Sequence, residues 1–265
     1  MRRPSLDLLR CVQCQRGHLA PEEAVPEPRL IFGPVKCQAC GARYPVGEGL
    51  IDLVGERPRS MGAQRAFESP FVARTYERYV RPLLSFAVVR SGLDVESEYL
   101  LFKSLLGEPK GPVLDLGCGT GLFSRRLASE LPGAQLLAID VSRPMIEEAL
   151  AQAREAGAAV DFIRAQMPEL PFQDGVLGAV LMVGSLQLVE GLEVLMRELY
   201  RVLKPGGVWV ASTFQPPAPL KPLHRAMGLF GRQEDALKMA AERAGFARFE
   251  RVRMAPILVV RAERP

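Results

Sequence analysis

The sequence predicts an α/β protein in which a mostly parallel sheet of seven strands carries helices on both faces, after a small cysteine-bearing module. Three observations support this prediction. From Val113 onward, short apolar runs alternate with segments of helical periodicity, the pattern of a parallel sheet with crossover helices. Three glycines, Gly117, Gly119 and Gly121, follow the first apolar run. Two Cys-x-x-Cys pairs lie near the N-terminus.

Residues 1–55 are assigned to the N-terminal module. Its cysteines, Cys11, Cys14, Cys37 and Cys40, form two pairs separated by 22 residues, a spacing close to that of zinc ribbons. Two such turns bring four thiolates into one tetrahedron, so we expect a structural zinc ion. Rubredoxin-like iron and an empty or redox-active site are the alternatives. The module has almost no core of its own, so its folding energy is expected to come largely from metal binding.

A polar, proline-containing linker is expected at residues 56–64. After it, residues 67–86 are rich in aromatic side chains at helical spacing. Residues 95–106 repeat apolar side chains with the same period. We therefore predict that residues 65–110 are largely helical and that the sheet occupies residues 111–265.

The sheet is predicted from alternating strand and helix patterns. The predicted strands are residues 112–116, 135–140, 159–164, 177–183, 207–213, 246–254 and 256–262, the last two forming an antiparallel pair. The predicted helices are residues 121–131, 143–157, 190–203 and 233–244. Ser142 is well placed to cap the second of these helices, and Gly157 to end it.

The segment from Val113 to Gly121 has the features of a binding site for a nucleoside cofactor. Its glycines permit a tight turn and a close backbone approach. Asp140 ends the next strand, nineteen residues beyond the last glycine, where an acid can chelate ribose hydroxyls. The spacing departs from the G-x-G-x-x-G of dinucleotide sites, and Asp115 stands two residues before the first glycine. A carboxylate there repels phosphate and attracts a sulfonium or α-ammonium group, the charge pattern of S-adenosylmethionine.

In these motifs the sequence resembles the class I methyltransferases, whose sheet is Rossmann-like. Residues 164–172 look like the third cofactor motif of that family, and residues 203–207 like the turn before its fifth strand. Residues 69–78, after a Cys-x-x-Cys pair, are similar to the zinc-ribbon-bearing relatives of the ubiquinone and menaquinone methyltransferases. The resemblance implies a class I methyltransferase domain at residues 65–265, in which residues 65–110 form a helical cover over the cofactor.

The same resemblance implies S-adenosyl-L-methionine as the cofactor and a role for the residues around it. Asp115 is expected to face the methionine ammonium group, and Asp140 to hold the ribose hydroxyls. The residues expected to surround the rest of the cofactor are Gly117, Cys118, Gly119, Gly121, Val141, Gln166, Met167 and Val183. Cys118 is interpreted as a small filler rather than a nucleophile, because no base stands near it in the sequence.

Two residues depart from the pattern of the family. Gln166 stands where Asp commonly receives the adenine amino group, and its amide oxygen can still accept that hydrogen bond. Gln187 stands where many relatives have a His, and glutamine cannot act as a general base. His224 is the candidate catalytic base, because it follows a proline-rich run near the expected mouth of the site. Further candidates are Arg81, Asp94, Glu98 and Tyr79.

The expected function is S-adenosylmethionine-dependent methylation, at oxygen or carbon, of a small, partly hydrophobic molecule such as a quinone precursor, a phenol or a secondary metabolite. One alternative is a ribosomal RNA methyltransferase, because some of these enzymes also join an N-terminal cysteine zinc site to this fold. The formal charge of +4 is mild, and the module lacks the basic and aromatic interleaving expected for RNA. The other alternative is a non-catalytic cofactor-binding scaffold whose zinc module recruits a protein partner.

The sequence predicts neither a secretion signal nor a membrane span. The first ten residues lack a long apolar run, and the longest uncharged apolar stretch, residues 175–189, is shorter than the ~20 residues of a membrane helix. We therefore expect a cytoplasmic location.

Overall fold

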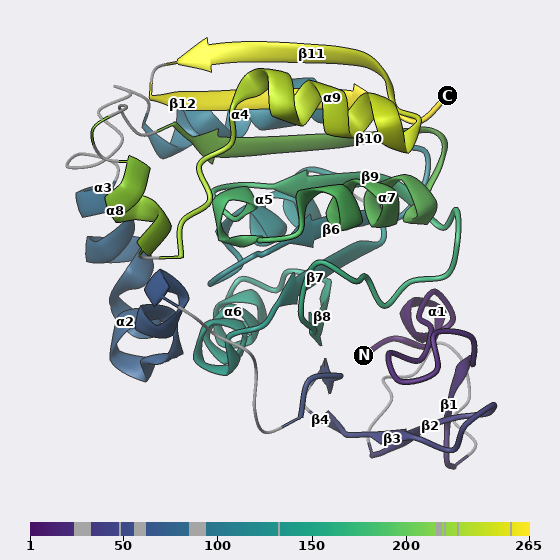
Figure 1. Cartoon of the computed structure of the whole chain (residues 1–265). Coiled ribbons are helices and arrows are strands. Elements are labelled where there is room, and N and C mark those ends of the chain that lie inside the picture. The colour runs from purple at the N-terminus through teal and green to yellow at the C-terminus, as the bar shows by residue number, and fades with distance from the viewer. Residues whose placement is uncertain are drawn as a thin grey trace.

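The computed structural model describes residues 1–23, 33–47, 49–55, 62–84, 94–131, 133–215, 219, 221–226, 228–254 and 256–265. Its centre is a twisted sheet of nine described strands with helices on both faces (Figure 1). The strand order is β11-β12-β10-β9-β6-β7-β8-β5-β4. Among the described residues, every helix is too short or too polar to span a bilayer.

Seven of these strands are the seven that the sequence predicts. They are β6 (Val113–Leu116), β7 (Leu136–Asp140), β8 (Val160–Arg164), β9 (Leu177–Met182), β10 (Leu203–Phe214), β11 (Ala247–Met254) and β12 (Ile257–Glu263). Strands β6 to β10 pair in parallel, and β12 pairs antiparallel with both β10 and β11. Because parallel strands end at one edge of a sheet, the residues that follow β6, β7, β8, β9 and β10 meet there.

Two short strands, β4 (Val46–Gly47) and β5 (Leu50–Asp52), extend the sheet at one edge. Strand β5 pairs in parallel with β8, and its central residue Ile51 is fully buried. These strands come from the part of the chain that the sequence assigned to the cysteine module. Strands this short have no periodic signal, so only pairing with β8 reveals them. Residues 56–61 of the expected linker lie outside the described residues.

Alternate residues of each strand pack against helices on opposite faces. On one face, α4 (Val95–Leu106) and α5 (Leu122–Glu130) share a buried cluster with Val113, and α6 (Arg143–Glu155) packs beside them on β7 and β8. On the other face, α7 (Leu192–Val202) and α9 (Glu234–Ala244) share a cluster with Leu114. The expected cap is confirmed, because the Ser142 hydroxyl accepts a hydrogen bond from the Met145 N–H at 3.3 Å.

The cysteine module covers the α7 and α9 face of the sheet. It contains α1 (Arg3–Leu6) and a three-stranded antiparallel sheet of β1 (Leu19–Pro21), β2 (Val35–Cys37) and β3 (Arg43–Tyr44). Leu6 and Leu9 are fully buried in the same cluster as Leu137 of β7 and Ile163 of β8. The module therefore shares the core of the main sheet. Its stability depends on this apolar contact as well as on any bound metal.

A helical segment lies at the carboxyl edge of the parallel strands. It consists of the 3-10 turn η1 (Gly62–Glu68), α2 (Pro70–Thr75), a π-helical turn η2 (Tyr76–Val80) and α3 (Arg81–Leu84). We call residues 62–84 the cover. The short helices α8 (Lys221–Ala226) and η4 (Leu186–Leu188) belong to the segments that follow β10 and β9. In Figure 1, α2, α3 and α8 gather at the same end of the molecule.

Candidate active site

The turn between β6 and α5 needs glycine for both conformation and packing. Gly117, Gly119 and Gly121 have φ angles of +78°, +56° and +76°, a region that favours glycine. A Cβ at Gly117 would lie 2.4 Å from the Cβ of Ser185, and one at Gly121 would lie 3.0 Å from the Cβ of Ala149. Gly117 and Gly119 line the cavity described below, whereas Gly121 packs against α6 instead.

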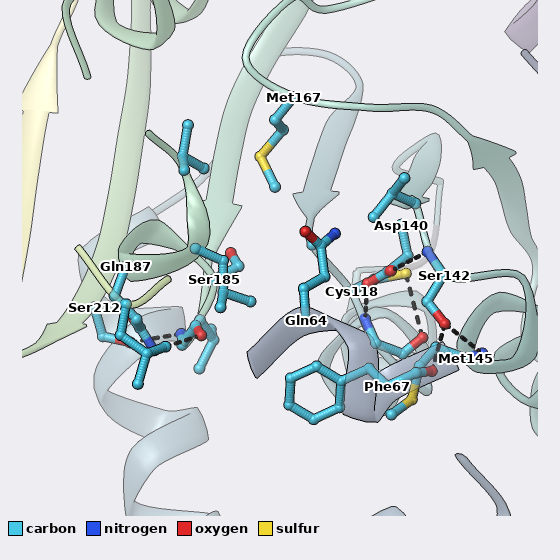
Figure 2. Close-up of a pocket in the computed structure, with 18 of the residues that line it drawn as sticks. Gln64, Phe67, Cys118, Asp140, Ser142, Met145, Met167, Ser185, Gln187 and Ser212 are labelled. Carbon is cyan, nitrogen blue, oxygen red and sulfur yellow. Dashed lines mark hydrogen bonds between the residues drawn. The ribbon is translucent and has the colours of Figure 1, made fainter. Parts of the chain in front are cut away.

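Asp140, at the end of β7, holds the turn in place. Its carboxylate accepts hydrogen bonds from the N–H groups of Gly119 and Ser142, each at 2.8 Å (Figure 2). Burial raises the pKa of Asp140, an effect that these backbone N–H groups partly oppose. An ionised carboxylate has about four lone-pair positions, so each oxygen can still accept a hydrogen bond from a ligand.

Asp115 lies inside the strand β6 and is only 2% exposed. Its carboxylate accepts a hydrogen bond from the Ser124 hydroxyl at 2.6 Å. Burial raises the pKa of Asp115 to about 6; the Ser124 hydrogen bond opposes this rise, and the nearby carboxylate of Asp140 adds to it. Within the described residues, no ion pair neutralises Asp115. A buried carboxylate in this state attracts a cationic ligand group.

These side chains line one cavity of about 1230 Å³ (Figure 2). Small-molecule pockets typically measure roughly 300–1,000 Å³, so this cavity has room for a cofactor and a second molecule. The predicted residues that line it are Asp115, Gly117, Cys118, Gly119, Asp140, Val141, Gln166, Met167 and Val183. Burial raises the pKa of the Cys118 thiol well above its ordinary value, which supports the interpretation of this side chain as a filler.

The sequence did not identify Gln64, Phe67 and Met145, which lie near Asp140 and Ser142 in Figure 2. Gln64 and Phe67 come from the cover, and Met145 from the first turn of α6. The helical period predicted the cover only from residue 67. Residues 62–64 were expected to belong to the linker, but they form the start of the 3-10 turn η1, and neither segment contains a motif that assigns a single side chain to a ligand.

Away from Asp140, the cavity is closed on one side by the cover and α4. Arg81 and Glu98 form an ion pair at 2.5 Å there, and the Arg81 guanidinium lies 5.0 Å from the centre of the Phe123 ring. Burial raises the pKa of Glu98, and Arg81 opposes this rise. The other two candidates do not line the cavity. Asp94 caps α4 by accepting a hydrogen bond from the Ser97 N–H, and the Tyr79 side chain is directed to solvent.

On the opposite side, three polar atoms of the cavity lining lack a hydrogen-bond partner within the described part of the chain. They are Gln187 Oε1, Thr213 Oγ1 and His224 Nδ1. The Gln187 amide donates to the carbonyl of Gly184 at 2.7 Å, and the His224 ring centre lies 5.5 Å from that of Phe214. His224 thus reaches the cavity as predicted. Thr213 was missed, because a single polar residue in an apolar strand gives no distinct sequence signal.

The cover is joined to the glycine turn through Glu77. Its carboxylate accepts a hydrogen bond from the Thr120 hydroxyl at 2.6 Å and two from the Arg125 guanidinium at 2.8 and 3.0 Å. Thr120 belongs to the turn and Arg125 to α5. The position of the cover is therefore coupled to the loop that surrounds the carboxylates.

The four predicted metal ligands come together in the module. The sulfur atoms of Cys11, Cys14, Cys37 and Cys40 all lie within 4.8 Å of one another, and the pairs Cys11–Cys40 and Cys14–Cys37 are each 3.7 Å apart. Thiolates bound tetrahedrally at the usual ~2.3 Å from zinc are separated by roughly 3.8 Å, so the cluster fits that geometry. A Cβ at Gly17 would lie 2.1 Å from the Cys37 sulfur, so only glycine allows this approach.

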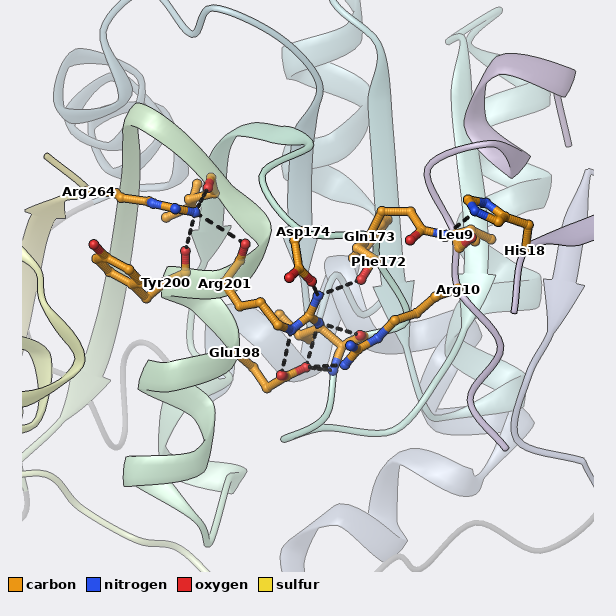
Figure 3. Close-up of polar contacts among 12 residues, drawn as sticks. Leu9, Arg10, His18, Phe172, Gln173, Asp174, Glu198, Tyr200, Arg201 and Arg264 are labelled. Atoms are coloured by element: carbon orange, nitrogen blue, oxygen red, sulfur yellow. Dashed lines mark hydrogen bonds and ion pairs between the residues drawn. The ribbon is translucent and has the colours of Figure 1, made fainter. Parts of the chain in front are cut away.

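The module contacts the segment that follows β8, residues 164–172, whose sequence resembles the third cofactor motif. The Arg10 N–H donates to the carbonyl of Pro171 at 3.0 Å. The Glu198 carboxylate pairs with Arg10 at 3.1 Å and with Arg201 at 2.7 Å (Figure 3). It also accepts a hydrogen bond from the Leu170 N–H at 2.9 Å. This network fixes the chain a few residues beyond Gln166.

Comparison with known proteins agrees with this arrangement. A family model described as a methyltransferase domain matches residues 113–207. A demethylmenaquinone methyltransferase of Thermus thermophilus is 38% identical over 105 residues, which cover 40% of this chain and 48% of that protein. An uncharacterised chloroplastic methyltransferase of Arabidopsis thaliana is 27% identical over 257 residues, covering 87% of this chain and 71% of that protein. This chain thus matches about half the length of the Thermus relative.

A solved structure shares the fold. Geranyl diphosphate C-methyltransferase from Streptomyces coelicolor superposes with a TM-score of 0.57 over 64% of this chain and 76% of that chain, at 18% identity. The matched family region begins at β6 and ends within β10, and so includes the glycine turn, Asp140 and the third cofactor motif. The chain thus carries a methyltransferase domain at residues 113–207, and in sequence and fold it is similar to the class I S-adenosylmethionine-dependent methyltransferases.

Proposed function

We propose that this protein transfers a methyl group from S-adenosyl-L-methionine to an oxygen or carbon atom of a small, partly hydrophobic molecule. The observation that carries the proposal is one large, mostly apolar cavity within the described part of the chain. The buried carboxylate of Asp115 and the half-buried carboxylate of Asp140 line one end of it, and the unpartnered polar atoms of the β9 and β10 side line the other. The names of the relatives favour a quinone precursor, and a phenol or another secondary metabolite has the same chemistry.

The cavity residues fit this cofactor. We assign Asp115 to the methionine ammonium group, because it is a buried carboxylate without a cationic partner among the described residues. Asp140 is assigned to the ribose hydroxyls, since both of its oxygens retain free lone pairs. Val141, Gln166 and Met167 are assigned to adenine, and the backbone of Gly117 and Gly119 to the methionine and ribose. When bound, the cofactor supplies an activated methyl group on a positively charged sulfur.

The protein contributes alignment and exclusion of water. Holding two reactants in line can lower a barrier by about 7–11 kcal/mol, more than one general base provides. The unpartnered atoms of Gln187, Thr213 and His224 offer hydrogen bonds to a polar group of the substrate. An unsatisfied buried polar atom costs about 1–3 kcal/mol, so a substrate hydroxyl or carbonyl is favoured there. Where the substrate must lose a proton, we assign its removal to the His224 side chain.

We assign a structural zinc ion to the four cysteines. None of the four lines the described cavity, so we assign the metal a structural role rather than a direct part in methyl transfer. Its role is to hold the module against residues 169–173 and, through them, the segment that carries Gln166. A second proposal for the module is that its surface recruits a protein partner.

Two other functions, methylation of RNA and a non-catalytic scaffold, can be distinguished from this one by experiment. RNA is less favoured, because exposed arginines of the C-terminal strands pair with acids, as Arg251 and Arg253 do with Glu234. The test is incubation of the full chain with methyl-labelled cofactor and a fractionated cell extract. We expect label in organic-soluble small molecules, and loss of that label with Asp140→Ala but not with Asp174→Ala. Label confined to RNA would establish the RNA alternative, and cofactor binding without label in any fraction would establish the scaffold.

A further inference from the structure

The helical part of the cover has two apolar faces. Residues 72, 73, 76, 77 and 80 turn inward: Val72, Tyr76 and Val80 line the cavity, Ala73 is only 2% exposed, and Glu77 binds the glycine turn. The opposite side carries Phe71, Tyr79 and Leu83, which are 75%, 58% and 65% exposed. An ordinary surface helix has one apolar face, directed to the core. A second exposed apolar face marks a site of interaction.

Two exposed arginines, Arg74 and Arg78, lie among these apolar side chains. We call Phe71, Arg74, Arg78, Tyr79 and Leu83 the outer face of the cover. The Arg78 guanidinium lies 5.3 Å from the centre of the Tyr79 ring, so the basic and apolar groups are adjacent.

The exposed charged side chains of the described cover are all positive. Exposed Arg65 adds to the two arginines of the outer face. The acidic residues of the described cover, Glu68 and Glu77, are half-buried, and Glu77 is paired with Arg125. No exposed acidic side chain offsets the arginines within the described cover.

We propose that the outer face of the cover docks on an anionic lipid membrane. A helix with large apolar side chains and flanking arginines, and without exposed acids, has the composition of an interfacial helix that rests in the headgroup layer. Each arginine is attracted by the negative surface potential of the membrane, and the aromatic and aliphatic side chains enter the layer between the headgroups.

Docking at this face places the cavity beside the bilayer. The inner side of the same helical segment lines the cavity, so only one helix, about 10 Å thick, separates the lipid surface from that space. The bond network of Glu77 then holds the glycine turn in a fixed position relative to the membrane. A hydrophobic substrate dissolved in lipid would reach the cavity without crossing water. The docking itself is independent of methyl transfer, so it is testable without turnover.

The test is co-sedimentation of the full chain with vesicles of phosphatidylcholine alone or of phosphatidylcholine mixed with phosphatidylglycerol. We expect binding to the anionic vesicles that weakens as salt is added. Arg74→Glu and Arg78→Glu are each expected to reduce the affinity at least about fivefold, since each arginine contributes near a surface of this charge. Phe71→Glu and Leu83→Glu are expected to reduce it about tenfold.

Met239→Glu is the matched control. Met239 is 49% exposed on α9, outside the cover, so this variant introduces the same charge at an apolar surface position and should bind vesicles as the unaltered chain does. Retained binding of S-adenosylhomocysteine shows that each variant is folded. Absence of sedimentation with anionic vesicles would overturn the proposal, as would equal losses for Phe71→Glu and Met239→Glu. A dimer that Phe71→Glu dissociates, without vesicle binding, would assign the face to a second copy instead.

Discussion

The Asp140 carboxylate accepts a hydrogen bond from the Gly119 N–H at 2.8 Å, so the end of one strand fixes the turn that follows its neighbour. The two residues are brought together because β6 and β7 pair in parallel and end at the same edge. One side chain thus shapes the glycine turn and, in the function that we propose, also offers its remaining lone pairs to the ribose.

Asp140→Ala is expected to weaken binding of S-adenosylhomocysteine about 10- to 100-fold. The variant removes charge-assisted hydrogen bonds, worth about 1.5–3 kcal/mol, and releases the Gly119 N–H. Isothermal titration calorimetry measures the change. Asp174→Ala is the control, because Asp174 is an exposed acid paired with Arg201 and should leave the affinity unchanged. Equal affinities for both variants would place the ribose elsewhere.

Asp115 is expected to make the ligand-free protein less stable as the pH rises. Its pKa is raised to about 6 from an ordinary value of 3.8, so the folded state binds this proton more tightly than the unfolded state. The stabilising contribution is present below pH 3.8 and is lost as the pH rises through about 6. The full contribution of this shift to the free energy of unfolding is about 3 kcal/mol, because each pKa unit corresponds to 1.36 kcal/mol.

Asp115→Asn tests this account by having opposite effects on stability and binding. Well above pH 6, the ligand-free variant should melt at a higher temperature than the unaltered protein, because it no longer buries a charge. The same variant should bind S-adenosylmethionine more weakly, because the ammonium group loses its anionic partner. For the unaltered protein, cofactor affinity should fall below pH 6. A lower melting temperature for the variant would contradict the assignment of a destabilising charge.

Cys37→Ser is expected to abolish retention of zinc. Elemental analysis of the purified chain should give one zinc per molecule for the unaltered protein and for Cys118→Ser, whose thiol lies outside the cluster. Because Leu6 and Leu9 share the main core, loss of metal should loosen the module rather than release it, seen as faster hydrogen exchange in residues 8–19. Stoichiometric zinc in Cys37→Ser would refute the four-cysteine site.

Glu77→Ala is expected to uncouple the cover from the glycine turn. The variant leaves the Thr120 hydroxyl and the half-buried Arg125 without this carboxylate, at a cost of about 1–3 kcal/mol. Hydrogen exchange in residues 70–84 should quicken, and cofactor affinity should fall several-fold. Glu147→Ala removes a carboxylate from an exposed pair with Arg143, and neither quantity should change. Unaltered exchange in Glu77→Ala would show that the cover is held by apolar contacts alone.

The sequence alone determined the features that depend on neighbours in the chain. Apolar periodicity predicted the seven strands and four helices of the sheet, because it records which side of each element is buried. Glycine spacing, the positions of Asp115 and Asp140 and the two Cys-x-x-Cys pairs predicted the cofactor and metal sites, because those chemistries need fixed local spacings.

Tertiary structure decided what joins distant parts of the chain. Glu77 and Thr120 are 43 residues apart, and the pairing of β5 with β8 joins residues more than a hundred positions apart. The sequence assigned the residues of β5 to the module, and it gave no sign that Thr213 lines the same cavity as His224. Periodicity specifies that a face is buried but not against which partner. That choice depends on packing the whole chain around one core, in which the module and the sheet bury a shared apolar surface.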